Sequence, residues 1–122
     1  MVLVDTSVWS ALYRGRTSEV GERIWQLAAS NRAAVCGQVW VEFLGGFRRE
    51  TERREYEASL AAFPFLETRR AAFTRAAQYL ARHPALGPGD AIIAATAIDH
   101  GAALFTLDGD FRVLVKQGLE LH

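Results

Sequence analysis

The amino-acid sequence predicts an α/β fold in which a central, mainly parallel sheet of four or five short strands is flanked by helices. Short apolar runs alternate along the chain with longer segments whose apolar residues recur at helical spacing. The short runs are apolar at every position, as is typical of parallel strands that helices cover on both faces. Asp5 and Asp108 follow two of these runs, and ligands collect at the carboxyl ends of parallel strands.

Two strands are expected in the first half of the chain. In order, its elements are a strand at 2–4, a helix at about 6–14, a helix at about 18–30, a strand at 33–36 and a helix at about 38–49. Gly15 ends the first helix, and Gly37 forms the turn before the last one. The second helix has an apolar face that consists of Val20, Ile24, Leu27 and Ala28.

The second half is expected to be mainly helical. Its elements are helices at about 51–62, 69–82 and 91–100, a strand at 103–105, a helical turn at 110–115 and a last strand at 119–121. Pro64 stops the first of these helices, because proline cannot continue the hydrogen-bond ladder. The turn Gly87-Pro88-Gly89 leads to Asp90, and Gly101 caps the carboxyl end of the helix that follows.

Length and composition indicate a single domain that spans residues 1–122. The chain of 122 residues can bury one core and is too short for two. No stretch approaches the roughly 20 apolar residues of a membrane helix, so no membrane contact is expected. The one cysteine, Cys36, excludes an internal disulfide and indicates a reducing compartment, which we take to be the cytoplasm. Its apolar neighbours favour a small buried side chain over a nucleophile.

Carboxylates that are far apart in the sequence are candidates for one shared site. Asp5 and Asp108 follow strands, and Asp90 precedes a helix. These aspartates, or Asp110 in place of Asp108, can equally cap the helices that they precede, so both interpretations stay open for each residue. Three such acids at one edge of a sheet favour a common site.

Glu42 is the acid that is hardest to explain as a surface residue. The helix around it is apolar over most of its circumference, so we expect the side chain to be largely buried. Burying a glutamate without a cation costs free energy or raises its pKa, and no Lys or Arg lies three or four residues away. Alternatively, Glu42 faces solvent beside Gly45 and Gly46.

A divalent cation would remove the repulsion among these carboxylates. Mg²⁺ and Mn²⁺ prefer oxygen ligands, and Mg²⁺ keeps positions open for water and for substrate phosphate. Zinc is poorly served, because Cys36 and the three histidines show no zinc spacing. With four of the 14 acidic residues in one site, the other ten face 14 basic residues, a balance that suits an anionic substrate.

Hydroxyl residues flank two of the acids. Thr6 and Ser7 follow Asp5, and Thr106 precedes Asp108. These side chains can bond a carboxylate, hold a metal-bound water or contact a phosphate. They can equally be local turn residues, and the sequence does not decide between the two interpretations.

Arginines and aromatic residues elsewhere are candidates for contacts with partners. Arg14 and Arg16 lie near the first acid and can guide an anionic substrate. A second group alternates with glutamates and more simply forms a self-paired helix surface; it consists of Arg48, Arg49, Arg53 and Arg54. The large aromatic residues are expected mainly in the core, and any exposed members can form a groove for a partner helix or a dimer patch; they are Trp9, Tyr13, Trp25 and Trp40.

Four segments of the chain resemble the signature motifs of the PIN domain. They are VDTSVW at 4–9, VEFLGG at 41–46, GDAIIAATAIDHG at 89–101 and LFTLDGDF at 104–111. The order and spacing of the four segments fit the family over the whole chain. In detail the sequence is similar to the VapC toxins of bacterial and archaeal type II toxin–antitoxin pairs.

The resemblance implies a Mg²⁺- or Mn²⁺-dependent ribonuclease that hydrolyses RNA with a metal-activated water. It also implies a homodimer that a VapB-like antitoxin holds inactive. By motif position, the metal-binding and catalytic acids are Asp5, Glu42, Asp90 and Asp108, with Asp110 as a helper. The family's hydroxyl positions correspond to Thr6 or Ser7 and to Thr106.

The alternative from a different class of function is a non-catalytic protein-binding module whose acids are only helix caps. Other phosphate-handling α/β enzymes are disfavoured. The chain lacks both G-x-G-x-x-G and G-x-x-x-x-G-K-[ST]. A receiver domain would need an aspartate near the middle of the chain, and residues 40–60 contain none.

Overall fold

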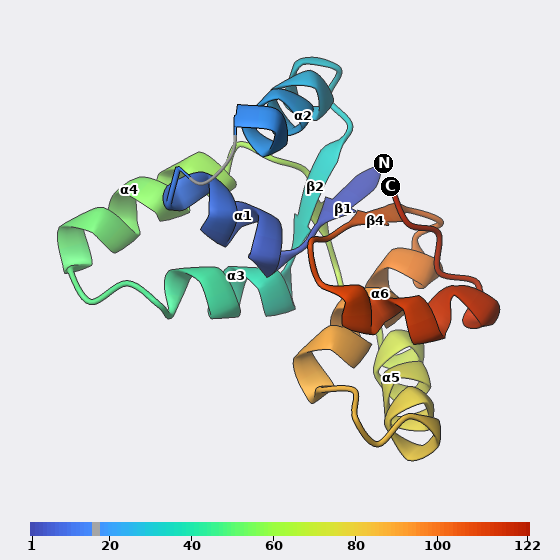
Figure 1. Ribbon diagram of the computed structural model, residues 1–122. Helices are drawn as coiled ribbons and strands as arrows, with labels where there is room; N and C mark the ends of the chain where they lie inside the picture. Colours follow the sequence, from blue (N-terminus) through green and yellow to red (C-terminus); the bar gives the residue numbers. More distant parts are fainter. Residues whose placement is uncertain (16–17) are drawn as a thin grey trace.

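The computed structural model describes residues 1–15 and 18–122, whose strands form a four-stranded parallel sheet in the order β3-β2-β1-β4 (Figure 1). The strands are β1 (Val2–Val4), β2 (Ala33–Cys36), β3 (Phe65–Leu66) and β4 (Ala103–Phe105). The other elements are α1 (Thr6–Tyr13), α2 (Ser18–Ala29), α3 (Gly37–Leu44), α4 (Glu50–Leu60), α5 (Arg70–Arg82), α6 (Pro88–Asp99) and the 3₁₀ helix η1 (Gly109–Gln117).

Helices cover both faces of the sheet, which explains why the central strands are apolar throughout. Helices α1 to α4 lie on one side, and α5, α6 and η1 lie on the other (Figure 1). Every residue of β1 and β2 is buried. Helix α6 is buried over most of its circumference, because its alanines let it approach its neighbours closely. None of the helices in the described residues has the length and hydropathy that a membrane span requires.

The order of the strands places a topological switch point at the carboxyl end of β1. The chain runs outward from β1 to β2 and β3, and then returns to place β4 on the other side of β1. Val2 therefore pairs with Ala33 of β2 and with Ala103 of β4. Loops that leave adjacent strands in opposite directions leave space between them, and this is where open parallel sheets bind ligands.

The predicted fold class and the strands at 2–4, 33–36 and 103–105 are confirmed. Strand β3 was not expected, and the strand expected at 119–121 is reduced to one bridge between Leu104 and Leu121. The helix expected at 38–49 ends at Leu44, where Gly45 forms the C-cap, so residues 45–49 connect α3 to α4. The helical turn at 110–115 belongs to the longer η1. Arg16 lies outside the described residues.

Candidate active site

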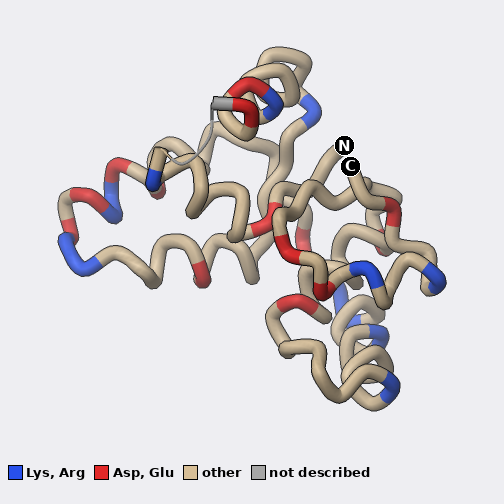
Figure 2. Tube along the Cα trace, viewed as in Figure 1, with Lys and Arg blue, Asp and Glu red and all other residues tan. Residues whose placement is uncertain are grey.

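The acids that the sequence singles out come from elements that meet at the carboxyl edge of the sheet. Asp5 directly follows β1, and Asp108 lies just after β4. Asp90 lies in the first turn of α6, and Asp110 lies in the first turn of η1. Figure 2 shows acidic positions that gather around this edge, where the chain leaves β1 and β4.

Three of these carboxylates form a tight group. Oxygen atoms of Asp90, Asp108 and Asp110 all lie within 4.8 Å of one another. The sequence suggests Asp110 only as a helper. In the structure, its carboxylate lies near enough to those of Asp90 and Asp108 for all three to bind one ion. The backbone N–H of Asp110 also donates to Oδ1 of Asp108 at 2.9 Å, which holds the two residues in one turn.

Asp5 is buried and held by hydroxyl groups. Its exposed fraction is 3%, and its Oδ2 accepts from the hydroxyls of Ser7 at 2.7 Å and Thr106 at 2.8 Å. The described residues supply no hydrogen-bond donor to Oδ1 of Asp5, so that oxygen is left for another partner. Of the interpretations open for Ser7 and Thr106, the structure supports bonding to a carboxylate. This contact fixes the orientation of the Asp5 side chain.

The expectation that Glu42 is buried is wrong. Its side chain is exposed, and two neutral donors orient it: Thr6 Oγ1 donates to Oε1 at 2.8 Å, and Gln38 Nε2 donates to Oε2 at 2.7 Å. Helix α3 buries Val39, Phe43 and Leu44, so its opposite face is open to solvent. Gln38 lies four residues before Glu42, and the sequence does not indicate this contact because glutamine carries no charge to balance the carboxylate.

Gly89 permits the close approach of α6 to Glu42. A Cβ atom at position 89 would overlap Oε2 of Glu42 and would lie 2.9 Å from Nε2 of Gln38. From the sequence, Gly89 is only part of the turn before α6. In the structure it brings the backbone next to Asp90 against the carboxylate of Glu42, which is a second reason for glycine at this position.

The pKa of Asp90 is raised in the folded protein. Burial is the largest cause, and the negative charges of the neighbouring acids add to it, so the pKa rises from 3.8 to about 6. The acids that contribute, in decreasing order, are Asp5, Asp108, Glu42 and Asp110. The other four carboxylates predicted from the sequence therefore all act electrostatically on Asp90.

Helix capping is confirmed for two of the acids and is wrong for the third. Asp5 is the N-cap of α1, and Asp108 is the N-cap of η1. Asp90 is not a cap, because the N-cap of α6 is Gly87. For Asp5, capping and membership of the acidic group are compatible, because Oδ2 makes the capping contact and Oδ1 stays available.

The donor set fits a hard divalent cation. The group consists of carboxylate oxygens, which are the ligands that Mg²⁺ and Mn²⁺ prefer. Within the described residues, none of the five acids forms an ion pair with Arg or Lys, so their charge is not balanced by the protein. Cys36 is buried, and burial, with smaller contributions from the charges of Asp5 and Glu42, raises its pKa to about 11, which leaves it an unreactive thiol.

Fold and site together define an α/β protein with an acidic, cation-compatible centre at the switch point of a parallel sheet. Residues 2–117 match the model of the PIN domain, and the chain belongs to this family. The resemblance seen in the four sequence motifs is thus confirmed.

Individual relatives are proteins of the VapC type. The chain is 29% identical over 124 residues to Ribonuclease VapC11 of Mycobacterium tuberculosis and to VapC ribonuclease Mb1587 of Mycobacterium bovis, with 95% of this chain and 92% of each relative covered. It is similar to a toxin–antitoxin complex from Klebsiella pneumoniae, with a TM-score of 0.78, 25% identity and coverage of 92% and 91% of the two chains. The fold is also shared with Mycobacterium tuberculosis VapC20, a sarcin–ricin loop cleaving toxin, with a TM-score of 0.70, 23% identity and coverage of 93% and 94%.

Replacing Gly89 by alanine should weaken cation binding without unfolding the protein. The new Cβ would displace the carboxylate of Glu42, and lost support of a metal site typically lowers affinity by about 10- to 100-fold. Titration calorimetry with Mn²⁺ measures this loss. Gly87→Ala is the matched control, because nothing lies within 4 Å of a Cβ at that position. Equal Mn²⁺ affinity of the two variants would contradict the role given to Gly89.

Replacing Asp90 by asparagine should remove a pH-dependent loss of stability. The pKa of Asp90 is raised to about 6 in the folded protein, so its contribution to stability is complete below pH 3.8 and is lost as the pH rises through 6. In metal-free buffer at pH 7, the variant should be more stable than the wild type by about 1 kcal/mol, a value reduced for screening by solvent. Urea unfolding between pH 4 and pH 7 measures the difference, and an identical slope for both proteins would refute it.

Proposed function

We propose that this chain is a Mg²⁺- or Mn²⁺-dependent endoribonuclease and the toxin of a VapBC-type toxin–antitoxin pair. The observation that carries the proposal is the set of five carboxylates at one edge of the sheet. Four of them act electrostatically on Asp90, and none forms an ion pair within the described residues. The names of the relatives, which are VapC ribonucleases, support RNA as the substrate. The proposed reaction is hydrolysis of RNA phosphodiester bonds by water.

The roles of the acidic residues follow from their contacts. We assign cation binding to Asp90 and Asp108, which form the tight group with Asp110, and to Asp5 through Oδ1. Asp110 and Glu42, of which Glu42 lies outside the tight group, complete the proposed site. When bound, a divalent ion supplies positive charge that screens the phosphate and lowers the pKa of a water beside it. The task of the protein is then to position charge, because stabilising the phosphoryl oxygens is the main catalytic requirement.

The hydroxyl residues act as positioning residues in this proposal. Ser7 and Thr106 hold Oδ2 of Asp5, and Thr106 Oγ1 also accepts from the backbone N–H of Asp108 at 3.0 Å. Thr106 thereby connects the acid after β1 with the acid after β4. Thr6 performs the same task for Glu42 from the first turn of α1.

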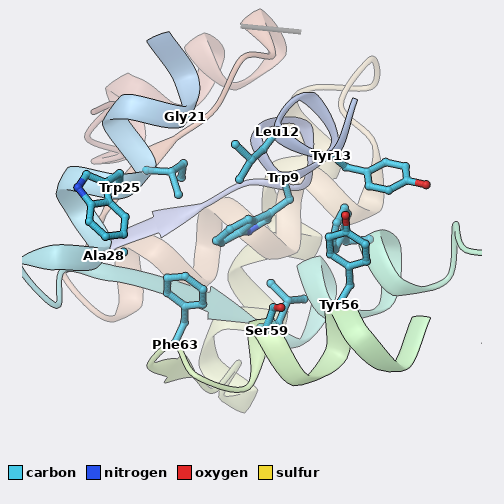
Figure 3. A pocket seen from close by; sticks show the side chains of 12 residues that line it. Trp9, Leu12, Tyr13, Gly21, Trp25, Ala28, Tyr56, Ser59 and Phe63 are labelled. Atoms are coloured by element: carbon cyan, nitrogen blue, oxygen red, sulfur yellow. The ribbon is translucent and has the colours of Figure 1, made fainter. Parts of the chain in front are cut away.

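An apolar groove is the proposed binding site for a VapB-like antitoxin. It has a volume of about 450 Å³ and lies between α1, α2 and α4. Figure 3 shows Trp9 in the middle of the groove, with Trp25 of α2 on one side and Tyr56 and Ser59 of α4 on the other. Trp25 is 71% exposed, which is unusual for so large an apolar side chain. Structures with this fold include toxin–antitoxin complexes, which favours an antitoxin segment as the occupant.

The proposal also includes the assembly and the location of the protein. We propose that residues 1–122 act as a single domain, that two copies form a homodimer, and that the pair works in the cytoplasm. Exposed apolar side chains away from the groove, among them Val41, Phe65 and Phe73, offer a surface for the second copy.

A non-catalytic protein-binding module is the second candidate. It is favoured by one observation, the N-cap contacts of Asp5 and Asp108, which would explain these residues without a cation. The capping contacts do not explain Asp90. It is not the N-cap of α6, and the negative charges of four neighbouring acids raise its pKa. The two candidates differ in what happens when Asp5 loses its charge.

Replacing Asp5 by asparagine should abolish RNA cleavage and preserve the fold. Asparagine still caps a helix and accepts the two hydroxyl donors, but it removes the negative charge that holds the cation. Purified protein, freed of antitoxin, should cleave single-stranded RNA with Mg²⁺ or Mn²⁺ and stop when chelator is added. We expect the rate of the variant to fall by roughly 100-fold or more, measured on labelled RNA in gels.

Glu120→Gln serves as the control, because it removes a charge from an exposed side chain outside the acidic group. It should keep the cleavage rate of the wild type. Equal cleavage by the wild type and Asp5→Asn would favour the binding module or reveal a contaminating nuclease.

Replacing Trp25 by alanine should weaken antitoxin binding by more than about 30-fold, because a large exposed aromatic side chain in an apolar groove is a typical binding hot spot. Calorimetry with the antitoxin encoded beside this chain measures the affinity. Val115→Ala removes an exposed apolar side chain outside the groove and should bind normally. If Trp25→Ala binds as tightly as the control, the groove is not the antitoxin site.

A further inference from the structure

A polar cleft beside the acidic site contains arginines that the cation site does not use. Its volume is about 610 Å³, and it lies between the end of α1, the segment that connects α3 to α4, and the start of α4. Glu42 is one of its lining residues, so the cleft adjoins the proposed active site. The basic side chains in its lining are Arg14, Arg48 and Arg49.

The structure divides the arginine cluster at 48–54 into two groups with different partners. Arg53 forms ion pairs with Glu50 and Glu57, and Arg54 forms one with Glu50. The self-paired surface expected from the sequence is therefore confirmed for these two arginines. Arg48 and Arg49 line the cleft instead, and basic positions mark the connection between α3 and α4 in Figure 2.

The arginines of the cleft have no carboxylate partner within residues 1–15 and 18–122. None of Arg14, Arg48 and Arg49 forms an ion pair there, and all three side chains are exposed. The two acids in the lining already have other partners: Glu42 accepts from Thr6 and Gln38, and Glu52 accepts from the hydroxyl of Tyr13 at 3.0 Å. Three guanidinium groups are thus gathered in one hollow and are free to bind an external anion.

The chemistry of the cleft matches a nucleic-acid backbone. Guanidinium groups bind phosphate with paired hydrogen bonds, and they are less strongly hydrated than ammonium groups. Tyr13 also lines the cleft and is 44% exposed, so this aromatic side chain is accessible to a base. A combination of arginines and an exposed aromatic ring is typical of surfaces that hold single strands.

We propose that this cleft binds the RNA strand on one side of the bond that is cleaved, with Arg14, Arg48 and Arg49 contacting backbone phosphates. The proposal rests on the ribonuclease function proposed above and extends it to a substrate site that the acidic group does not include. The cleft supplies positive charge to the part of the RNA strand that extends beyond the acidic residues. Because it does not contact the bond that is cleaved, it favours binding of the substrate and of the transition state equally. Its loss should therefore raise KM and leave kcat nearly unchanged.

The test compares two double variants with the same change in charge. Arg48→Gln/Arg49→Gln alters the cleft, and Arg53→Gln/Arg54→Gln alters the self-paired group on the neighbouring helix. Both are made in the Asp5→Asn background, so that RNA is bound but not cleaved. The probe is a fluorescein-labelled 15-nucleotide single-stranded RNA of mixed sequence, measured by fluorescence anisotropy with Mg²⁺ at several salt concentrations.

We expect the cleft variant to bind the RNA roughly tenfold more weakly than the control. The slope of log Kd against log salt should fall by about 0.7 for each phosphate contact that is lost. Arg14→Gln, on the other wall of the cleft, should weaken binding by about fivefold. In the active background, KM should rise by the same factors while kcat changes less than about twofold. Melting temperatures check that all variants are folded.

Equal affinity and equal salt slopes for the two double variants would overturn the proposal. It would also be overturned if the cleft variant kept its RNA affinity and instead bound the antitoxin more weakly, because the cleft would then belong to the protein partner. Failure of the cleft and failure of the proposed function give different results. If the wild type cleaves RNA and the cleft variant keeps its KM, only the cleft proposal is lost. If the wild type does not cleave, the ribonuclease proposal is lost. The anisotropy data then test only whether the cleft binds RNA.

Discussion

Repulsion among carboxylates at one edge of the sheet is the constraint on which the functional architecture depends. Asp90 lies close enough to four other acids for their charges to raise its pKa, which is an unfavourable arrangement in the absence of a cation. The fold imposes it through the backbone: the N–H of Asp5 donates to the carbonyl of Phe105 at 2.9 Å, so the ends of β1 and β4 cannot move apart. Both strands are almost fully buried, and the packing that holds them is the source of free energy that offsets the repulsion.

The hydrogen bonds around these acids are all of one kind, and this determines what the site can bind. Hydroxyls of Thr6, Ser7 and Thr106, together with the amide of Gln38, orient the carboxylates of Asp5 and Glu42. Neutral donors fix a side chain without cancelling its charge, whereas an arginine would do both. In the part of the chain that the structure describes, no arginine forms an ion pair with any of these acids. The acids are thus positioned and remain free to attract a cation.

The sequence predicts the parts of this structure that follow from local pattern. The buried strands at 2–4, 33–36 and 103–105 are found as expected, because continuous apolar runs between helices have few other interpretations. Strand β3 has two residues and an exposed Phe65, so it carries no pattern that distinguishes it from a loop. The exposure of Glu42 could not be predicted either, because it depends on which face of α3 the rest of the protein covers.

Contacts across space, rather than residue types, account for what the sequence did not reveal at the site. Gly89 is recognisable as a turn residue, but its closeness to Glu42 exists only after α3 and α6 have packed. From the sequence alone, capping and metal binding are competing explanations of Asp5. The structure makes them compatible by giving each oxygen of that carboxylate a different environment.

Helix α1 connects the three regions that the proposals involve. Asp5 caps its amino end, and Tyr13 at its carboxyl end lines both the apolar groove and the arginine cleft. A helix of eight residues is only about 12 Å long, so its two ends, which contribute to the three regions, are close together on one rigid element. Tyr13 is itself held by Glu52 and by edge contacts with Phe47 and Tyr56. A segment that fills the groove would therefore contact the same side chain that lines the cleft, so the proposed partner site and the proposed substrate site share Tyr13.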